Sequence, residues 1–410
     1  MDVNGPKHGM RVAWLFAAIA LLVMAAVIVG CGSGGGSTAE EVVIGVDASM
    51  SGPLAGFGAY EKWAIDTFVS KLNESGGVTI EGKKTKVKVV ILDDKSDPNV
   101  AASNIDTLVT KHNAIALIGP VTPAVGNAAA LAADRNRIPY LETGNPLEPF
   151  RAVKEWTWAW DFFFSTPDMA KGAFQSLADL GITEKTNKQV FICMDNSPDG
   201  PVFIDAFSSE AKAAGWKIAG VDSHPSNATE FGSLIGKLKN SNADYVIFLG
   251  DTPQEVALRK QMASAGYAPK ILYFVRGAQL QQFADALGPL SDGVMLEAYW
   301  LPEMPYPGAK ELGDEYASST GQSIGQILGL EYTAAQILTD AITKANSEDP
   351  TKINTALGET DGTYVGGPVR FDAPNHTSVT PLTFTQWQNK KCMIIWPTDM
   401  ANSEMIFPLP

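Results

Sequence analysis

Short apolar segments alternate with amphipathic ones along the chain, and this alternation constrains the fold more than any other feature. Apolar residues recur at helical spacing in several segments, as in Ile65, Phe68, Val69 and Leu72. These helical segments separate four predicted strands, Val42 to Val46, Val87 to Leu92, Ala114 to Ile118 and Ile138 to Leu141. Strands separated by helices predict a parallel sheet that is covered on both faces.

The alternation starts again at Gln189. Strands are predicted at Gln189 to Met194, Trp216 to Val221, Tyr245 to Leu249 and Ile271 to Phe274. Helices are predicted near Phe203 to Ala214, Phe231 to Lys239 and Pro253 to Ala265. Two α/β units of similar size predict two lobes with a cleft between them. Because parallel sheets bind ligands at the carboxyl ends of their strands, two facing sheets can enclose a small molecule.

The C-terminal part departs from this alternation. A long helix is predicted from Ile327 to Ala345. It is followed by predicted strands at Val369 to Phe371, Leu382 to Trp387 and Lys391 to Trp396. The last two strands are separated by Gln388-Asn389-Lys390, which we interpret as a hairpin turn.

The N-terminal residues are interpreted as an export signal and a tether rather than as part of the fold. Lys7 and Arg11 precede an apolar run from Val12 to Val29, long enough for a signal or a membrane-spanning helix. The run ends in Ile28-Val29-Gly30-Cys31, which resembles a bacterial lipobox. We therefore expect residues 1–30 to be a cleaved signal peptide, Cys31 to be lipidated and residues 31–41 to be a flexible Gly/Ser tether. A retained transmembrane helix is the alternative.

Charge and cysteine content limit the partners. Without residues 1–30 the chain has 29 basic and 44 acidic residues, a formal charge of −15, so nucleic acid is not an expected partner. Cys193 and Cys392 each lie in an apolar strand-like run, and no CxxC spacing exists. Two buried free thiols are predicted, with a disulfide between them as the alternative.

The segment SMSGPLAGFGAY, Ser49 to Tyr60, joins the first strand to the first helix with a phenylalanine at the tip of a glycine-rich loop. Glycines at such a place can let backbone amides hold a phosphate. The spacing does not fit a Walker loop, because Phe57 and Gly58 stand where glycine and lysine are needed, and it does not fit G-x-G-x-x-G. No nucleotide or other cofactor is therefore predicted.

The sequence shows no catalytic constellation and no metal site. His112, His224 and His376 follow a helix or lie in turn-like sequence, so they are predicted to be solvated, and no G-x-S-x-G segment presents a serine. The pair Asp93-Asp94 is assigned a structural or hinge role, with an acid/base or metal site as the alternative. No cluster with metal-ligand spacing is present. We therefore expect a protein that is not an enzyme.

The segment WTWAWDFFF, Trp156 to Phe164, is unusually aromatic. On a strand its three alternating tryptophans would share one face. One interpretation is core packing, and the other is that one or two of the tryptophans line the cleft.

Four stretches carry a resemblance to a known family: IGVDASMSGPLAGFGAYEKWAIDTFVSKLNESGGV, ILDDKSDPNVAASNIDTLVTKHNAIALIGPVTPAV, GLEYTAAQILTDAI and GGPVRFDAPN. Their motifs MSGP, DDxSDP and IGP resemble those of the branched-chain amino-acid (Leu/Ile/Val) binding proteins, type I periplasmic binding proteins of ABC importers. The resemblance implies an α/β fold of two Rossmann-like lobes joined by three crossovers, placed here near Ser165, Leu301 and Ala373. Lobe 1 would comprise residues 42–165 and 302–373, and lobe 2 residues 166–301 and 374–410.

The resemblance also implies ligand-binding residues in lobe 1. Phe57 matches the aromatic residue that covers the ligand's side chain. Thr122 lies in the loop that binds the ligand carboxylate, although Pro123 stands where the family more often has serine. The segment that includes Thr143, Gly144 and Asn145 corresponds to the loop that binds both carboxylate and ammonium.

Lobe 2 departs from the family pattern. Asp199 stands where members often have tyrosine, Asp251 occupies the next strand-end loop, and Ala278 stands where an ammonium-binding glutamate is expected. Either Asp199 or Asp251 then supplies the counter-charge for an amine, or the ligand has no amine and Arg276 pairs with an extra anionic group. An Arg276 without a ligand, on a solvated loop edge, is the third reading.

These observations predict an extracytoplasmic, lipid-anchored solute-binding protein, expected to be a monomer, that delivers an amino acid or related small carboxylate to an ABC permease. Hinge closure of the two lobes would capture the ligand. One alternative is the ligand-sensing subunit of a signalling receptor. Another is a binding protein for amine-free ligands such as aromatic or short-chain acids or amides. An exported hydrolase would need a nucleophile, a base and an acid, which the sequence does not show.

Overall fold

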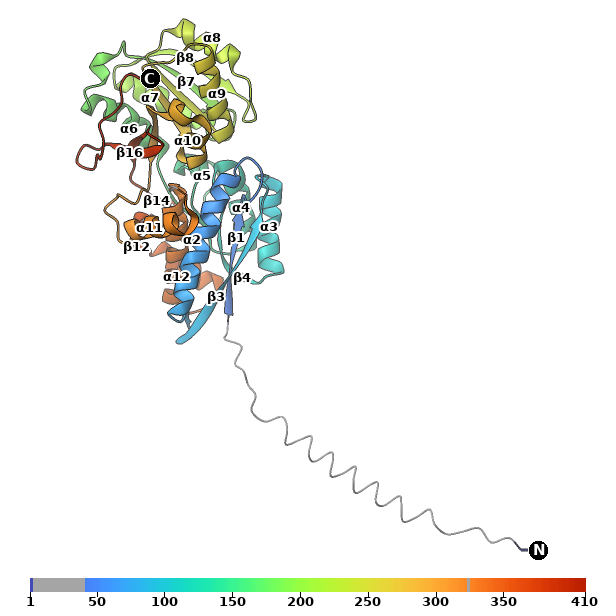
Figure 1. The fold of residues 1–410 in the computed structure, drawn as a ribbon. Helices are drawn as coiled ribbons and strands as arrows, with labels where there is room; N and C mark the ends of the chain where they lie inside the picture. The colour runs from blue at the N-terminus through green and yellow to red at the C-terminus, as the bar shows by residue number, and fades with distance from the viewer. Residues whose placement is uncertain (3–40, 323–324) are drawn as a thin grey trace. The chain divides into compact units, whose positions relative to one another are not determined.

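The computed structural model describes residues 1–2, 41–322 and 325–410, and its folded unit runs from Glu41 to Pro410 (Figure 1). The predicted signal peptide, most of the tether and the lipidation site Cys31 lie outside the described residues. Across the described part, no helix combines the length and the apolar character needed to cross a membrane.

The first seven-stranded sheet is built around β1 (Glu41–Ala48), which pairs in parallel with β3 and β4. Its strand order is β14-β6-β5-β4-β1-β3-β2, and β2 pairs antiparallel to β3. The other strands are β2 (Val78–Ile80), β3 (Lys83–Asp93), β4 (Ala114–Ile118), β5 (Tyr140–Glu142), β6 (Ala159–Phe163) and β14 (Thr377–Val379). The mostly parallel sheet predicted from the alternation is confirmed, and β2 is an addition that the sequence pattern did not reveal.

Amphipathic helices bury their apolar faces against this sheet. α3 (Pro98–Thr110) begins where the carboxylate of Asp97 accepts hydrogen bonds from the amides of Asn99 and Val100, a side-chain cap that satisfies first-turn donors. The remaining helices and the small hairpin of this part are α2 (Ala55–Glu74), α4 (Pro123–Asn136), α5 (Leu147–Val153), α11 (Ala309–Thr320), α12 (Ile327–Ala345), α13 (Pro350–Gly358), β12 (Asp361–Tyr364) and β13 (Gly367–Arg370). The bounds of α12 are those predicted from the sequence.

The second seven-stranded sheet has the order β16-β15-β11-β10-β9-β7-β8. Its strands are β7 (Gln189–Asp195), β8 (Lys217–His224), β9 (Tyr245–Gly250), β10 (Ile271–Arg276), β11 (Val294–Ala298), β15 (Thr383–Gln388) and β16 (Lys391–Trp396). The associated helices are α6 (Thr166–Asp179), α7 (Gly200–Ala213), α8 (Gly232–Ser241), α9 (Thr252–Ser264) and α10 (Gln281–Leu287), with short 3-10 helices η1 (Thr183–Lys185), η2 (Gly277–Gln279) and η3 (Gly288–Ser291). β15 and β16 form the predicted antiparallel hairpin.

The tryptophan segment does not form the strand that was predicted for it. β6 begins only at Ala159, so Trp156 and Trp158 precede it. Trp156 stacks on Phe150 with ring centroids 4.8 Å apart and donates a hydrogen bond to the carbonyl of Phe150. Trp160 stacks on His376 at 3.8 Å. The prediction of three tryptophans on one strand face is therefore wrong, and core packing accounts for Trp156 and Trp160.

Two further expectations need correction. β14 pairs with β6 in the first sheet although the third crossover was placed near Ala373, so the chain passes to the second sheet only after Val379. His224 was predicted to be solvated but is 8% exposed, because its ring stacks on Phe248 and its nitrogens bond to the carbonyls of Pro225 and Leu249.

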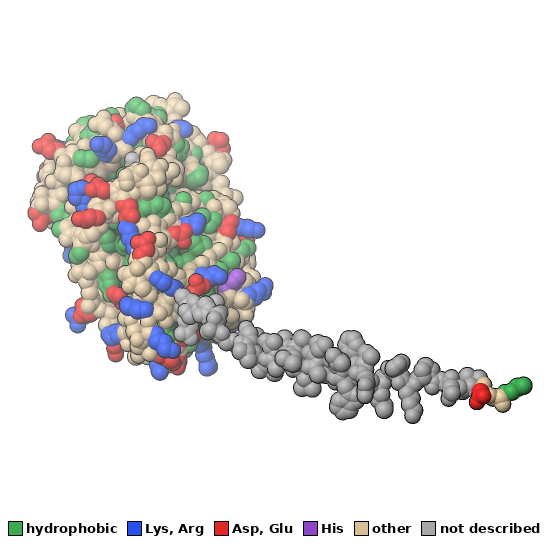
Figure 2. Space-filling view, turned by 60° about the horizontal axis from the view of Figure 1, so that its bottom comes forward, with side chains coloured by type: hydrophobic (Ala, Val, Ile, Leu, Met, Phe, Trp, Pro, Cys, Tyr) green, Lys and Arg blue, Asp and Glu red, His purple; other side chains and the backbone are tan. Residues whose placement is uncertain are grey.

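Charged side chains of both signs are interspersed on the face shown in Figure 2, so the described residues form no broad area of one sign there. The ion pairs between exposed partners, such as Lys62 with Asp66, are of the kind that contributes little to stability. Cys193 is a buried free thiol, as predicted, and Cys392 is a free thiol that is partly buried.

Candidate functional site

The segment between β1 and α2 is fixed by the aspartate pair at the end of β3. Asp94 accepts a hydrogen bond of 2.7 Å from the hydroxyl of Ser49. Asp93 accepts one of 2.7 Å from the hydroxyl of Ser51 and one of 3.0 Å from the amide of Met50. The structural role predicted for Asp93 and Asp94 agrees with these contacts, which hold the start of the glycine-rich segment in place.

Phe57 lies in the first turn of α2 and not at the tip of a loop, as the sequence had suggested. The helix begins early because Gly58 lets it approach β1. A Cβ on Gly58 would lie 2.3 Å from the carbonyl oxygen of Ser49, which is closer than real side chains come. A Cβ on Gly56 would lie 2.7 Å from Cδ1 of Leu280, which follows the second sheet's η2. The two glycines therefore allow the first turn of α2 to pack closely against its neighbours, and this packing fixes the position of Phe57.

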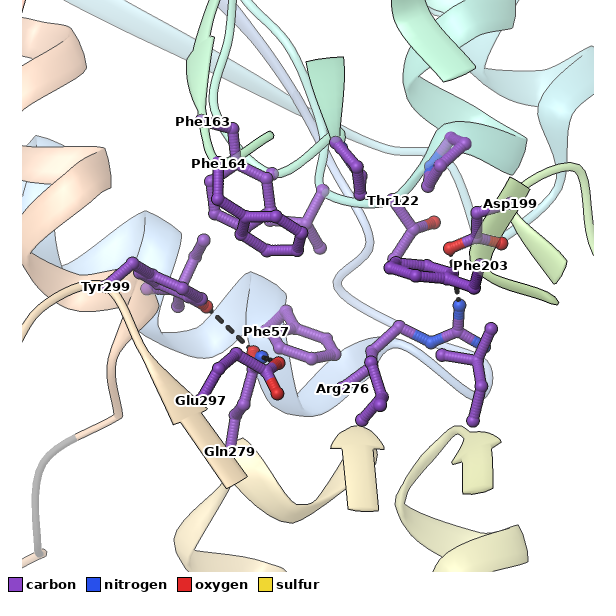
Figure 3. A pocket seen from close by; sticks show the side chains of 17 residues that line it. Phe57, Thr122, Phe163, Phe164, Asp199, Phe203, Arg276, Gln279, Glu297 and Tyr299 are labelled. Atoms are coloured by element: carbon purple, nitrogen blue, oxygen red, sulfur yellow. Dashed lines mark hydrogen bonds and ion pairs between the residues drawn. The ribbon is translucent and has the colours of Figure 1, made fainter. Parts of the chain in front are cut away.

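Phe57 lines a pocket whose walls come from both sheets (Figure 3). Most of the wall is apolar, and the polar side chains cluster near its ends. The side chains leave a free volume of about 30 Å³, so a ligand larger than a few waters needs an opened pocket. The lining residues are Phe57, Val121, Thr122, Pro123, Gly144, Pro146, Phe163, Phe164, Asp199, Phe203, Leu249, Val275, Arg276, Gln279, Glu297, Tyr299 and Ile327.

Thr122 supplies the polar part of the first sheet's wall. It is the N-cap of α4, its side chain makes no capping hydrogen bond, and its φ of 78° with ψ of 144° is rare for a residue other than glycine. Its amide donates to the carbonyl of Gly144, 3.0 Å away. Pro123 has no amide, and the amides of the next two residues have no acceptor within the helix. The hydroxyl and the start of α4 are therefore suited to an anion.

Thr143 and Asn145 do not line the pocket. The hydroxyl of Thr143 donates to Oε1 of Glu331 at 2.5 Å, and Nδ2 of Asn145 donates to Oδ1 of Asn127 at 2.8 Å. Both residues are fully buried. Of the three residues that the resemblance implied in this loop, only Gly144 reaches the pocket.

The buried carboxylate of Glu142 holds the backbone of the same loop through hydrogen bonds. The hydroxyl of Tyr140 donates to its Oε2 at 2.5 Å, and the backbone amides of Thr143 and Gly144 also donate to its carboxylate. Burial raises the pKa of Glu142 to about 8, against the opposing effect of these hydrogen bonds. The two amides are thus directed at Glu142.

Arg276 joins three strand-end loops of the second sheet. Its guanidinium pairs with Asp251 at 2.8 Å through Nε, with Asp199 at 3.0 Å through Nη1, and with Asp195 through Nη2. Its side chain is only 13% exposed, so the solvated loop edge considered from the sequence is wrong. Burial raises the pKa of Asp199, and Arg276 opposes this shift. A larger cavity of about 210 Å³ borders the cluster and shares Thr122, Asp199 and Arg276 with the pocket.

A second polar group in the wall was not found from the sequence. The carboxylate of Glu297 in β11 accepts a 2.6 Å hydrogen bond from the hydroxyl of Tyr273 and another from the amide of Gln279. The oxygen of the Gln279 amide in turn accepts a hydrogen bond of 2.8 Å from Tyr299 (Figure 3). This network was not predicted because β11 was not recognised as a strand and the contacts depend on how β10, η2 and β11 pack together.

The aromatic wall is also differently composed from expectation. Phe163 and Phe164 line the pocket, whereas the tryptophans that precede them do not. Phe163 packs against Tyr299 with ring centroids 4.8 Å apart, which joins the two halves of the wall. The run of three phenylalanines in the sequence could have indicated an aromatic pocket wall, but the sequence analysis considered only the tryptophans for that role. Residues 41–322 and 325–410 contain no group of side chains arranged to hold a metal ion.

The fold and the pocket define a two-sheet α/β protein with a pocket lined by residues from both sheets. The sequence profile of the periplasmic binding protein family matches residues 41–391, so the chain belongs to that family. The predicted type I fold, and the prediction of a binding protein rather than an enzyme, are thereby confirmed.

Relatives with similar sequences are distant but span nearly the whole chain. Leu/Ile/Val-binding protein homolog 7 of Brucella abortus (strain 2308) is 23% identical over 395 residues, covering 92% of this chain and 96% of the relative. Homolog 8 of the same strain is 26% identical over 385 residues, with coverages of 90% and 93%.

Solved structures share the fold. The substrate binding protein LivJ of Streptococcus pneumoniae, in complex with isoleucine, has a TM-score of 0.76 at 20% identity, covering 90% of this chain and 100% of LivJ. A solute binding protein of an ABC transporter from R. palustris, in complex with benzoate, has a TM-score of 0.74 at 16% identity, with coverages of 87% and 95%. At these identities the likeness concerns the fold.

Proposed function

We propose that this chain is the solute-binding component of an ABC importer and that it captures a small carboxylate in the pocket between its two sheets. The observation that carries the proposal is the uncapped start of α4. The hydroxyl of Thr122 makes no capping hydrogen bond, and the first-turn amides beside it have no acceptor within the helix. The positive end of a helix stabilises an anion at such a place.

The apolar wall defines the rest of the ligand. Phe57, Phe163 and Phe164 are nearly excluded from solvent and form an aromatic part of the pocket wall (Figure 3). A side chain of aliphatic or aromatic character fits such a wall, because its burial removes apolar surface from water. The relatives named for leucine, isoleucine and valine support a branched-chain amino acid as the first candidate.

A second class of ligand has support of its own. The wall is mainly aromatic, and the similar R. palustris protein holds benzoate. An aromatic acid without an amine could place its carboxylate at Thr122 and its ring against Phe57. It is therefore the second candidate for the same pocket.

We further propose that the helices and strands around each sheet form two lobes that open to admit the ligand. The small free volume of the pocket supports this step, since a leucine-sized ligand does not enter it as it stands. Lipidation at Cys31 would hold the protein at the membrane beside its permease. A sensory subunit would bind its ligand in the same pocket but would not be needed for uptake of that ligand. An uptake assay therefore separates the two functions.

A thermal-shift screen of amino acids, short-chain and aromatic acids, and amides tests the proposal. A ligand at a hundred times its dissociation constant adds about 2.7 kcal/mol to the free energy of unfolding. We expect carboxylates to raise the melting temperature and the matching amides, which lack the negative charge, to have little effect. Equal shifts with acids and amides would contradict the role given to α4.

The membrane and transport parts need a test in cells. Replacing Cys31→Ala should release the protein from the membrane fraction, and deleting the chain should abolish uptake of the ligand found in the screen. Uptake that continues unchanged in the deletion strain would favour the sensory alternative.

A further inference from the structure

Two buried glutamates lie behind the pocket wall, where α2 packs along α12 (Figure 1). Phe57 of α2 and Ile327 of α12 line the pocket, and Glu61 and Glu331 follow them one helical turn later, on the same helix faces. Each glutamate is therefore about 6 Å further along its helix than the pocket wall. Both side chains are fully excluded from solvent.

The two carboxyl groups have too few hydrogen-bond donors. Both oxygens of Glu61 and Oε2 of Glu331 have no hydrogen-bond partner among the described residues. The remaining oxygen, Oε1 of Glu331, accepts a hydrogen bond of 2.5 Å from the hydroxyl of Thr143. Buried polar groups are normally hydrogen-bonded and buried charges are normally paired, because an uncompensated charge in the interior is costly. Two ionised glutamates therefore do not suit this place.

The neighbouring groups increase this cost. The charges with the largest effect on Glu61 all belong to carboxyls from α12, the end of β3, β1 and β5, namely Glu331, Asp94, Asp47 and Glu142. Glu142 also acts on Glu331. Burial is the largest cause and raises the pKa of both glutamates, that of Glu331 to about 8 against the opposing hydrogen bond from Thr143. The fold thus favours a state in which the pair holds a proton.

A single proton supplies the donor that is missing between the two glutamates. A protonated carboxyl donates as well as accepts, so a neutral Glu61 can donate to Oε2 of Glu331. The distance between the Thr143 hydroxyl and Glu331 lies in the range of about 2.5–2.7 Å in which a hydroxyl donates to a carboxylate. This distance fits Glu331 as the charged member of the pair and Glu61 as the neutral one.

Glu331 is connected to the start of α4 through the loop that follows β5. Its partner Thr143 is followed by Gly144, which lines the pocket. The carbonyl of Gly144 accepts a hydrogen bond of 3.0 Å from the amide of Thr122, the residue assigned to the ligand carboxylate. A movement of Glu331 is therefore transmitted to the proposed carboxylate site.

We propose that Glu331 is a positioning residue for the ligand's carboxylate site and that it shares one proton with Glu61, so that the protein loses affinity for its ligand when this proton dissociates at alkaline pH. This inference rests on the proposed function. Loss of the proton leaves two like charges close together in the interior, and their repulsion moves α2 and α12 apart. Ligand binding, which keeps Phe57 and Ile327 packed over the pair, should in turn retain the proton, because such coupling is reciprocal.

Calorimetry on the purified protein at pH 6, 7, 8 and 8.5 tests the inference, with leucine and benzoate as the probes. The charge of benzoate is constant over this range, since carboxyls titrate near pH 4. We expect the affinity for the probe that binds to fall about tenfold from pH 6 to pH 8.5, which is within the limit of about tenfold per pH unit for one proton. Measurements in two buffers of different ionisation enthalpy should show that binding at pH 8 takes up protons.

Glu61→Gln imitates the protonated member of the pair, because its amide can donate to Glu331 at every pH. This variant should bind the probe as the wild type does at pH 6 and should keep that affinity at pH 8.5. Glu74→Gln is the matched control, since it changes an exposed glutamate of the same helix, and it should keep the pH profile of the wild type.

Three outcomes would overturn the inference. An affinity of the wild type that is constant from pH 6 to pH 8.5 would show that no proton is linked to binding. An equal loss of affinity at every pH in Glu61→Gln would indicate a structural role instead. A pH profile that persists in Glu61→Gln but becomes flat in Glu142→Gln would assign the titration to Glu142.

Failure of the proposed function has a different result. If neither probe binds at any pH and the thermal-shift screen finds no carboxylate, that function fails, and urea unfolding then decides on the shared proton. The free energy of unfolding should fall less steeply from pH 6 to pH 8.5 in Glu61→Gln than in the wild type, because a proton held more tightly in the folded state is lost as the pH rises. Equal slopes would overturn the shared proton as well.

Discussion

Arg276 and Thr122 are the two residues of the pocket whose backbone is strained. Arg276 has φ of 77° and ψ of −64°, the values of a rare γ-turn, and Thr122 has φ of 78° and ψ of 144°. Such conformations cost roughly 1–3 kcal/mol each and persist only where the surroundings impose them. Thr122 lies in the loop after β4 and Arg276 ends β10, and both line the same pocket, so the strain is concentrated at the proposed binding site.

Replacing Arg276→Met should strongly destabilise the protein. Removing the guanidinium leaves Asp195, Asp199 and Asp251 close together without a counter-charge, and breaking a buried pair in this way costs about 3–5 kcal/mol. Urea unfolding measures the loss. Arg135→Met is the matched control, because its partner Asp106 is exposed and such pairs contribute about 0–1 kcal/mol. Similar losses in both variants would show that the three pairs do not hold the loops together.

Phe57→Ala should weaken ligand binding at least about tenfold, since the ring provides much of the apolar wall. The ring is only 4% exposed, so some loss of stability is expected as well, and circular dichroism should confirm that the variant is folded. Calorimetry with the ligand found in the screen measures the affinity. An unchanged affinity in the folded variant would remove Phe57 from the site.

At the level of elements, periodic segments could be predicted well from the sequence and segments shaped by tertiary contacts could not. α12 and β16 have the predicted bounds because their apolar patterns are continuous. α2 begins inside a segment read as a loop, since Gly58 permits a close approach that propensity does not reveal. β11 was missed, and Glu297 with it, because this short strand is fixed by its pairing with β10 on one side and with the distant β15 on the other.

Gly58→Ala tests whether that close approach is required. The added Cβ would meet the backbone of Ser49 at 2.3 Å, so the first turn of α2 must move and stability should fall by more than about 1 kcal/mol. Gly236→Ala is the matched control in α8, where nothing lies within 4 Å of the new Cβ and a gain of about 0.5–1 kcal/mol is expected. Thermal unfolding of both variants measures the contrast. A neutral Gly58→Ala would mean that α2 does not depend on this glycine.

Across the whole molecule, buried carboxyls should make stability depend on pH. The pKa of Glu142 is about 8 in the folded protein against a usual 4.5, so the folded chain binds more protons between these values. The free energy of unfolding should therefore fall as pH rises from about 5 to 8, by up to about 1.4 kcal/mol per pH unit for one such group. Burial raises the pKa of Asp161 and Glu255 in the same direction.

Urea titrations at pH 5, 6, 7 and 8 measure this slope. Glu142→Gln should flatten it, whereas Glu184→Gln, which changes an exposed side chain, should leave it as it is. If Glu142→Gln leaves the slope unchanged, the pKa of Glu142 is not raised in the folded protein.

Substitutions at the contact between Gly56 and Leu280 should change the fraction of molecules that can bind a ligand. The two residues meet outside the pocket, where a side chain at position 56 would act as a wedge against the segment that follows η2. A larger residue there should favour the open arrangement of the lobes. The affinity for every ligand should then fall by one common factor, because apparent affinity is proportional to the fraction of molecules in the binding-competent state. Substitutions of graded size at this position would therefore set the detection range of a biosensor built on this protein, without altering its selectivity.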